Sequence, residues 1–71
     1  MDNPTPEEIA RHYSAMMDSV NLINSFVPTT DADDLDTLDR NVRHLEQMLL
    51  NDWWVGYDLT SINEAIVAGK Q

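Results

Sequence analysis

The sequence predicts an all-α fold, a small three-helix bundle with two longer helices and a short C-terminal helix. Apolar residues recur at steps of three and four over two long segments and one short segment. This spacing places them on one face of a helix. A capping signal precedes each segment, and a proline or a glycine separates successive segments. The expected helices cover residues 6–26, 31–52 and 60–68.

The first helix has the clearest start. Thr5-Pro6-Glu7-Glu8 combines an N-cap threonine, a proline at the first helical position and a glutamate three residues after the cap. This is the pattern of a capping box. Pro28 ends the segment, because proline cannot continue a helix. Asn21, Asn24 and Ser25 weaken the last turns, so the end is expected between Asn24 and Val27. The face expected to be buried consists of Ile9, Tyr13, Met16, Met17, Val20 and Ile23.

The second helix is predicted to begin at a cap supplied by Thr30 or Asp31. Its apolar residues step by three, four, three and four, so they form a two-heptad seam. The members of this seam are Leu35, Leu38, Val42, Leu45 and Leu49, and Met48 widens it.

The third helix follows a turn that Gly56 is expected to form. Asp58-Leu59-Thr60-Ser61 offers several N-cap residues, and Ser61 and Glu64 have the spacing of a second capping box. The helix should end near Ala68–Gly69, which leaves a short tail. Its narrow apolar face consists of Ile62, Ala65 and Ile66.

The length of the chain limits it to one domain over residues 1–71 with one modest core. A domain of 71 residues buries only about 60% of the surface that its unfolded chain exposes. Chains this short usually gain stability from disulfides, metals or association, and this one has no cysteine. We therefore expect a homo-oligomer or a part of a larger assembly.

The charge of the chain argues against two classes of partner. Thirteen acidic residues against four basic ones give a net charge of −9, which repels nucleic acid and anionic lipid. No apolar run approaches the ~18 residues that a membrane-spanning helix needs. The first residues also lack the basic and apolar regions of a signal peptide. We expect a protein that binds neither nucleic acid nor membranes directly and is not exported.

No pattern for catalysis or for a metal or cofactor site emerges from the sequence. A calcium loop that starts at Asp31 would have Leu35 at a ligand position and Asp36 where glycine is required. His12 and His44 lack zinc-site spacing, and both are expected on solvated helix flanks. The serines lack the glycines of a nucleophile elbow. We therefore expect a protein that is not an enzyme and has no cofactor.

Aromatic residues cluster between the second and third helices, where Trp53, Trp54 and Tyr57 lie within five residues. Tryptophan and tyrosine dominate the hot spots of protein interfaces. The structural alternative is that one tryptophan and the tyrosine close the small core while the other tryptophan stays half exposed. The two interpretations are compatible, because each tryptophan can serve one of them. All three residues are therefore candidates for binding a protein partner.

An acidic face is the second candidate surface. Regularly spaced carboxylates can imitate the phosphates of a duplex and occupy the basic groove of a nucleic-acid enzyme. The alternative is a solvated face, and Arg40 and Arg43 interrupt the acidic run, each four residues after an aspartate. The members of the acidic face are Asp31, Asp33, Asp34, Asp36 and Asp39.

The C-terminal part of the chain resembles small orphan proteins of tailed bacteriophages. The resemblance implies a viral origin, but it carries over neither an activity nor functional residues. It rests on the order Asn41-Val42-x-His44-Leu45-x-x-Met48-Leu49, then Asp52-Trp53-Trp54, then Asp58-Leu59-Thr60-x-Ile62-x-x-Ala65-Ile66-x-x-Gly69-Lys70.

Two classes of function fit a small helical phage protein without catalytic residues. The first is a virion accessory subunit, such as a capsid decoration, neck or tail component, that contacts other virion proteins or itself. We favour it because a small core and a clustered aromatic end suit a protein that repeated contacts complete. The alternative is an acidic inhibitor of a host defence or nucleic-acid enzyme. The expected location is the virion or the host cytoplasm.

Overall fold

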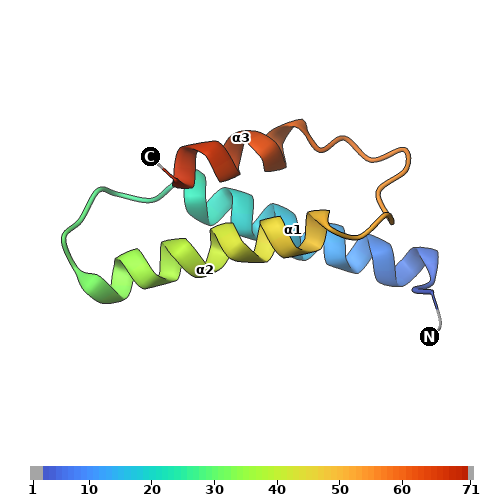
Figure 1. The fold of residues 1–71 in the computed structure, drawn as a ribbon, viewed down its shortest axis with the longest axis horizontal. Coiled ribbons are helices and arrows are strands. Elements are labelled where there is room, and N and C mark those ends of the chain that lie inside the picture. Colours follow the sequence, from blue (N-terminus) through green and yellow to red (C-terminus); the bar gives the residue numbers. More distant parts are fainter. Residues whose placement is uncertain (1–2, 71) are drawn as a thin grey trace.

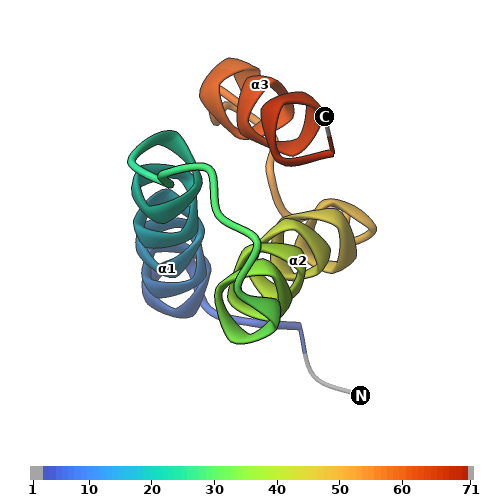
Figure 2. The same cartoon turned by 90° about the vertical axis from the view of Figure 1, so that its left-hand side faces the viewer.

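A computed structural model describes residues 3–70 and confirms the small all-α bundle. Its helices are α1 (Pro6–Asn24), α2 (Ala32–Leu49) and α3 (Thr60–Gly69). Each helix runs opposite to the one before it along a molecule of 42 × 23 × 16 Å (Figure 1). Seen end-on, the three helices occupy the corners of a triangle (Figure 2). The core therefore lies between the three helices and runs along the length of the bundle.

The first helix has the predicted capping box at its start. The Glu8 backbone N–H donates to Thr5 Oγ1 at 3.2 Å, and the Thr5 N–H donates to Glu8 Oε1 at 3.4 Å. The helix ends at Asn24, the first residue of the range from Asn24 to Val27 in which its end is expected. The Ser25 hydroxyl donates to the Leu22 carbonyl at 3.2 Å. Serine competes in this way with the helical backbone pattern.

The second helix begins where the sequence predicts and ends earlier. Asp31 caps it, with Oδ1 accepting the N–H groups of Asp33 and Asp34 at 2.8 and 3.3 Å. It ends at Leu49, so the prediction of residue 52 is wrong by three residues. The Trp54 indole N–H donates to the Met48 carbonyl at 2.9 Å. The same carbonyl accepts the Asn51 backbone N–H at 3.1 Å, so the indole adds a second donor at the end of the helix.

The start of α3 differs from the prediction. Its N-cap is Leu59, which makes no side-chain capping bond, so the expected capping box of Ser61 and Glu64 is wrong. The Thr60 N–H instead donates to Asp58 Oδ1 at 2.9 Å. This backbone bond, and then the side chain of Thr60, hold the pKa of Asp58 below its ordinary value of 3.8.

The lowered pKa of Asp58 predicts a pH dependence. A carboxyl group with a lower pKa in the folded state adds stability that is present above its unfolded pKa. That contribution is lost as the pH falls through the folded pKa. We therefore expect Asp58→Asn to be less stable than wild type near neutral pH, with the difference shrinking below the ordinary pKa of 3.8 and vanishing below the lowered pKa of the folded state. Urea unfolding across the acid range measures this difference, and Asp52→Asn in the same loop is the control. A difference that persists unchanged in acid would contradict the prediction.

The core takes residues from every helix. Met16, Leu45 and Ile62 are fully buried, one in each helix. The predicted seam of α2 is confirmed from Leu38 to Leu49, but Leu35 is 45% exposed and lies outside the core. The buried core residues are Met16, Val20, Ile23, Val42, Leu45, Trp54, Ile62 and Ala65.

A polar pair lies between α1 and α2. The buried Ser19 hydroxyl lies 2.9 Å from His44 Nδ1. His44 is therefore half-buried and bonded across the helix interface, and the expectation that it lies on a solvated flank is wrong. His12 is exposed, as expected, and its ring centroid lies 5.4 Å from that of Trp53.

The two histidines make a matched pair for mutation. His44→Ala removes the partner of the buried Ser19 hydroxyl, and we expect it to lower the free energy of unfolding by about 1–2 kcal/mol. His12→Ala should cost no more than about 0.5 kcal/mol, because the side chain is exposed. Urea unfolding of both variants measures the difference. Equal losses would show that the bond between Ser19 and His44 has no role in stability.

Candidate protein-binding surfaces

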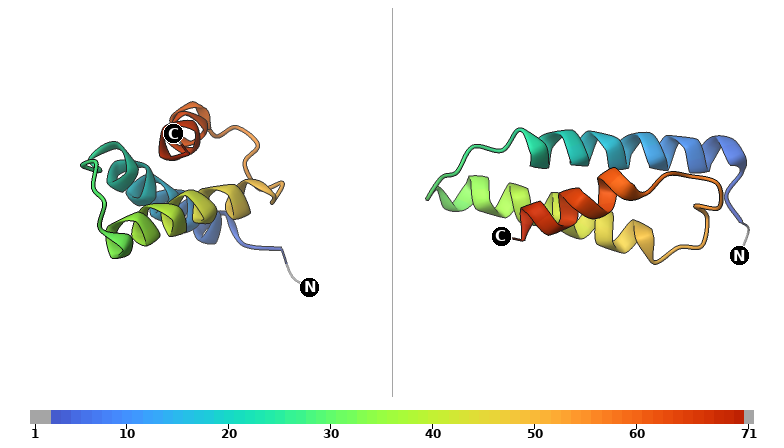
Figure 3. Two further views of the ribbon diagram at one scale, coloured as in Figure 1. Left: turned by 60° about the vertical axis from the view of Figure 1, so that its left-hand side comes forward. Right: turned by 90° about the horizontal axis from the view of Figure 1, so that it is seen from above.

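Residues 50–59, here called the aromatic loop, connect α2 to α3 at the end of the bundle where α1 begins (Figure 3). Gly56 has a φ of +84° and provides the turn, as expected. The Tyr13 hydroxyl donates to the Asp58 carbonyl at 2.8 Å. The Tyr57 ring lies 4.7 Å from that of Tyr13 and 5.7 Å from that of Trp54. These contacts hold the loop against α1.

The position of Trp54 argues against its predicted role as an anchor for a protein partner. Its side chain is only 6% exposed and belongs to the core, so it is not available as an anchor for a partner. Trp53 and Tyr57 are half-buried, and their role in binding stays a prediction. The structure adds two residues that the sequence reasoning missed, since Leu50 and Val55 are 79% and 91% exposed.

All five aspartates of the acidic face are exposed. Asp36 pairs with Arg40 at 2.8 Å and Asp39 pairs with Arg43 at 2.9 Å. The carboxylate of Asp31 is engaged as the cap of α2. Three members of the face therefore already have partners within the chain. Asp33 and Asp34 are the two whose carboxylates have no ion pair or hydrogen bond among the residues described.

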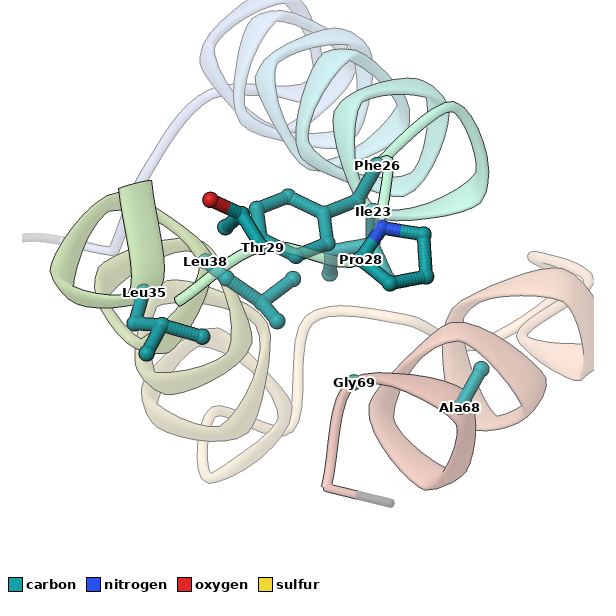
Figure 4. Close-up of a pocket in the computed structure, with 8 residues that line it drawn as sticks. All are labelled: Ile23, Phe26, Pro28, Thr29, Leu35, Leu38, Ala68 and Gly69. Carbon is teal, nitrogen blue, oxygen red and sulfur yellow. The ribbon is translucent and has the colours of Figure 1, made fainter. Parts of the chain in front are cut away.

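A cavity that the sequence reasoning missed lies at the opposite end of the bundle (Figure 4). It has a volume of about 330 Å³ and is partly open to solvent. The end of α1, the segment after it, the start of α2 and the end of α3 meet there. We call this cavity the end pocket. Its lining consists of Ile23, Phe26, Pro28, Thr29, Leu35, Leu38, Ala68 and Gly69.

The end pocket exists because α3 is short. Figure 1 shows that the first turns of α2 extend beyond the end of α3, so nothing from α3 covers Leu35. Gly69 lies directly against Val42 and Ile23, where a Cβ atom would collide with Val42 Cγ2. Because Gly69 has no side chain, the end of α3 can approach α2 closely. Gly69 therefore contributes only backbone atoms to the lining of the end pocket.

The surroundings of the end pocket are apolar and negatively charged. Val27 and Val67 are exposed, and a second depression that shares Phe26 with the end pocket includes Asp34. The C-termini of α1 and α3 both lie at this end, and neither helix has a basic residue in its last turn. Helix C-termini carry partial negative charge. Lys70, just after α3, forms an ion pair with Glu46 at 2.6 Å.

Within residues 3–70, no three acidic, histidine or cysteine side chains come together as metal ligands. No described helix is long and apolar enough to cross a membrane. No protein-family model matches this chain, and neither a curated protein nor a solved structure gives a match. The resemblance to orphan phage proteins therefore stays a prediction, and the surfaces of the chain carry the functional argument.

Proposed function

We propose that this chain is a non-enzymatic interaction protein that acts by contact with another protein. The observation that carries the proposal is the end pocket, an open cavity in which six of the eight lining residues have apolar side chains. Val27 and Val67, next in sequence to lining residues, are exposed. Leu50 and Val55 add exposed apolar surface at the other end. A 71-residue chain has little apolar surface to spare from its core. Residues left exposed at both ends are therefore best explained by contacts with other molecules.

We further propose that the interaction is that of a virion accessory subunit, such as a capsid decoration, neck or tail component of a phage. The resemblance of residues 41–70 to orphan phage proteins supports this proposal. A symmetric particle offers many equivalent contacts to a small subunit. The partners would then be other virion proteins or further copies of this chain.

Quantitative mass spectrometry of purified particles of the phage that encodes the chain tests this proposal. A virion accessory subunit should be present at a fixed number of copies per particle that survives further purification. A protein that is abundant in infected cells and absent from particles would contradict it. That result would favour the second candidate.

The second candidate function is an acidic inhibitor of a host defence or nucleic-acid enzyme. It is favoured by Asp33 and Asp34, whose carboxylates are exposed and unengaged among the described residues, and by the net charge of −9. Inhibition of a host nuclease in a salt-dependent manner would support it. Asp33→Asn with Asp34→Asn should then weaken inhibition, while unchanged potency would exclude charge mimicry. Asp31 is left intact in this test, because it caps α2.

A further inference from the structure

We infer that the end pocket binds a segment of a partner protein in which one bulky apolar side chain lies beside lysine or arginine residues. The inference rests on the proposed function as an interaction protein and specifies the chemistry of the partner. Three features of the end pocket support it: its size and lining, the charge around it, and the lack of a suitable segment in a second copy of this chain.

The lining of the end pocket suits an apolar side chain. Its volume of about 330 Å³ is at the lower end of the range of about 300–1,000 Å³ for pockets that hold small ligands. Such pockets use several polar groups to orient their ligand. Thr29 supplies the only side-chain hydroxyl here, and its Oγ1 already accepts the Asp31 N–H at 3.0 Å. Six of the eight lining residues have apolar side chains, so an apolar anchor gains from this lining, and the backbone and the Thr29 hydroxyl supply its polar surface.

The charge at this end of the bundle favours cationic neighbours for that anchor. The exposed carboxylates of Asp33 and Asp34 lie in the first turn of α2, and Leu35 follows them directly in the sequence. Asp34 also lies in the depression that shares Phe26 with the end pocket. The C-termini of α1 and α3 add partial negative charge. Lysine or arginine beside an apolar anchor would complement all of these groups.

A second copy of this chain does not provide such a segment. The chain has four basic residues and a net charge of −9. Three of those basic residues, Arg40, Arg43 and Lys70, already form ion pairs within the chain. Two copies that met at this end would bring like charges together, which disfavours binding. The occupant is therefore a different protein.

Selection from a random peptide library displayed against the immobilised full chain tests the inference. The recovered peptides should combine a large aliphatic or aromatic residue with two or more lysines or arginines. In amide NMR spectra of the chain, they should shift the signals of Phe26, Thr29, Leu35 and Gly69. Peptides that lack basic residues, or a selection that yields no binder, would overturn the inference.

A matched pair of variants separates pocket binding from general attraction to an acidic protein. Leu35→Asp and Val55→Asp each add one negative charge at an exposed apolar residue, at opposite ends of the bundle. Leu35→Asp should weaken the dissociation constant of a recovered peptide by about tenfold or more. Val55→Asp should leave it within about twofold. Circular dichroism checks that both variants stay folded. Equal or tighter binding to Leu35→Asp would show that charge alone attracts the peptides and would overturn the inference.

The acidic contribution has its own test. Asp33→Asn with Asp34→Asn should weaken peptide binding several-fold at low salt, and the effect should shrink as salt screens the charges. No effect at low salt would contradict the proposed cationic neighbours. In the NMR experiment, peptide-induced shifts confined to the amide signals of Trp53, Val55 and Tyr57 would overturn the inference. They would still be consistent with a protein that binds another protein. The proposed role in the virion fails separately, through the particle measurement described above.

Discussion

Replacing Trp54 with alanine is expected to lower the free energy of unfolding by about 3–5 kcal/mol, a large share of the stability of a chain this size. The side chain is 6% exposed within the core, and truncating a buried tryptophan costs about 3–5 kcal/mol. The variant also loses the indole N–H bond to the Met48 carbonyl at the end of α2. Folded domains have about 0.05–0.15 kcal/mol of stability per residue, or ~4–10 kcal/mol for a chain of this length. Circular dichroism and urea unfolding measure the loss.

Trp53→Ala is the matched control for this change. Trp53 is the adjacent residue in the sequence, but it is half-buried and its ring lies against the exposed His12. We expect the Trp53 variant to stay folded and to lose no more than about 1.5 kcal/mol. A Trp54→Ala variant that is as stable as Trp53→Ala but binds its partner more weakly would contradict the structure and restore Trp54 as a binding anchor.

Replacing Gly69 with alanine is expected to destabilise the protein, although a change from glycine to alanine in a helix usually stabilises it. Alanine normally stabilises a helix by up to about 1 kcal/mol relative to glycine. Here the new Cβ atom would collide with Val42 Cγ2 and lie 3.5 Å from Ile23 Cγ2. Val42 is buried and β-branched, so its side chain has little freedom to move. Overpacking of this kind costs about 1–3 kcal/mol, and we expect Gly69→Ala to be destabilising by about 1–2 kcal/mol.

A double-mutant cycle tests the cause of this loss. Val42→Ala removes the atoms that collide with the new Cβ atom, so Gly69→Ala should be neutral or stabilising in that background. The interaction free energy between the two changes should be at least about 1 kcal/mol. Urea unfolding of the four proteins gives this quantity. A Gly69→Ala variant that is more stable than wild type would show that α3 does not approach α2 as closely as described.

The parts of the fold that depend on local sequence could be predicted. The capping box at Thr5 and the cap at Asp31 act within a few residues, and the helical spacing of apolar residues identified the faces that meet in the core. The C-terminal end of α2 was predicted too late. At the end of α2, the indole of Trp54 binds the Met48 carbonyl, and the spacing of apolar residues does not reveal a bond made by a residue in the following loop.

The candidate site was harder to predict, because it depends on tertiary arrangement. Local sequence does not show which of two adjacent tryptophans faces the core, and the structure selects Trp54. Leu35 continues the heptad spacing of α2, yet it is exposed because α3 ends before it reaches the first turn of α2. The end pocket combines residues from 23 to 69, so no single segment carries a signal for it. Phe26 and Pro28, apolar residues just after a helix, were the available hint.

Hydrogen exchange in the native assembly tests most directly whether the end pocket is the surface that a partner covers. The chain would be purified with its bound partner and compared with the free chain by mass spectrometry of exchanged peptides. Binding at the end pocket predicts slower exchange in residues 25–38 and 66–70, with residues 50–57 unchanged. Slower exchange confined to residues 50–57 would contradict it and place the interface at the aromatic loop.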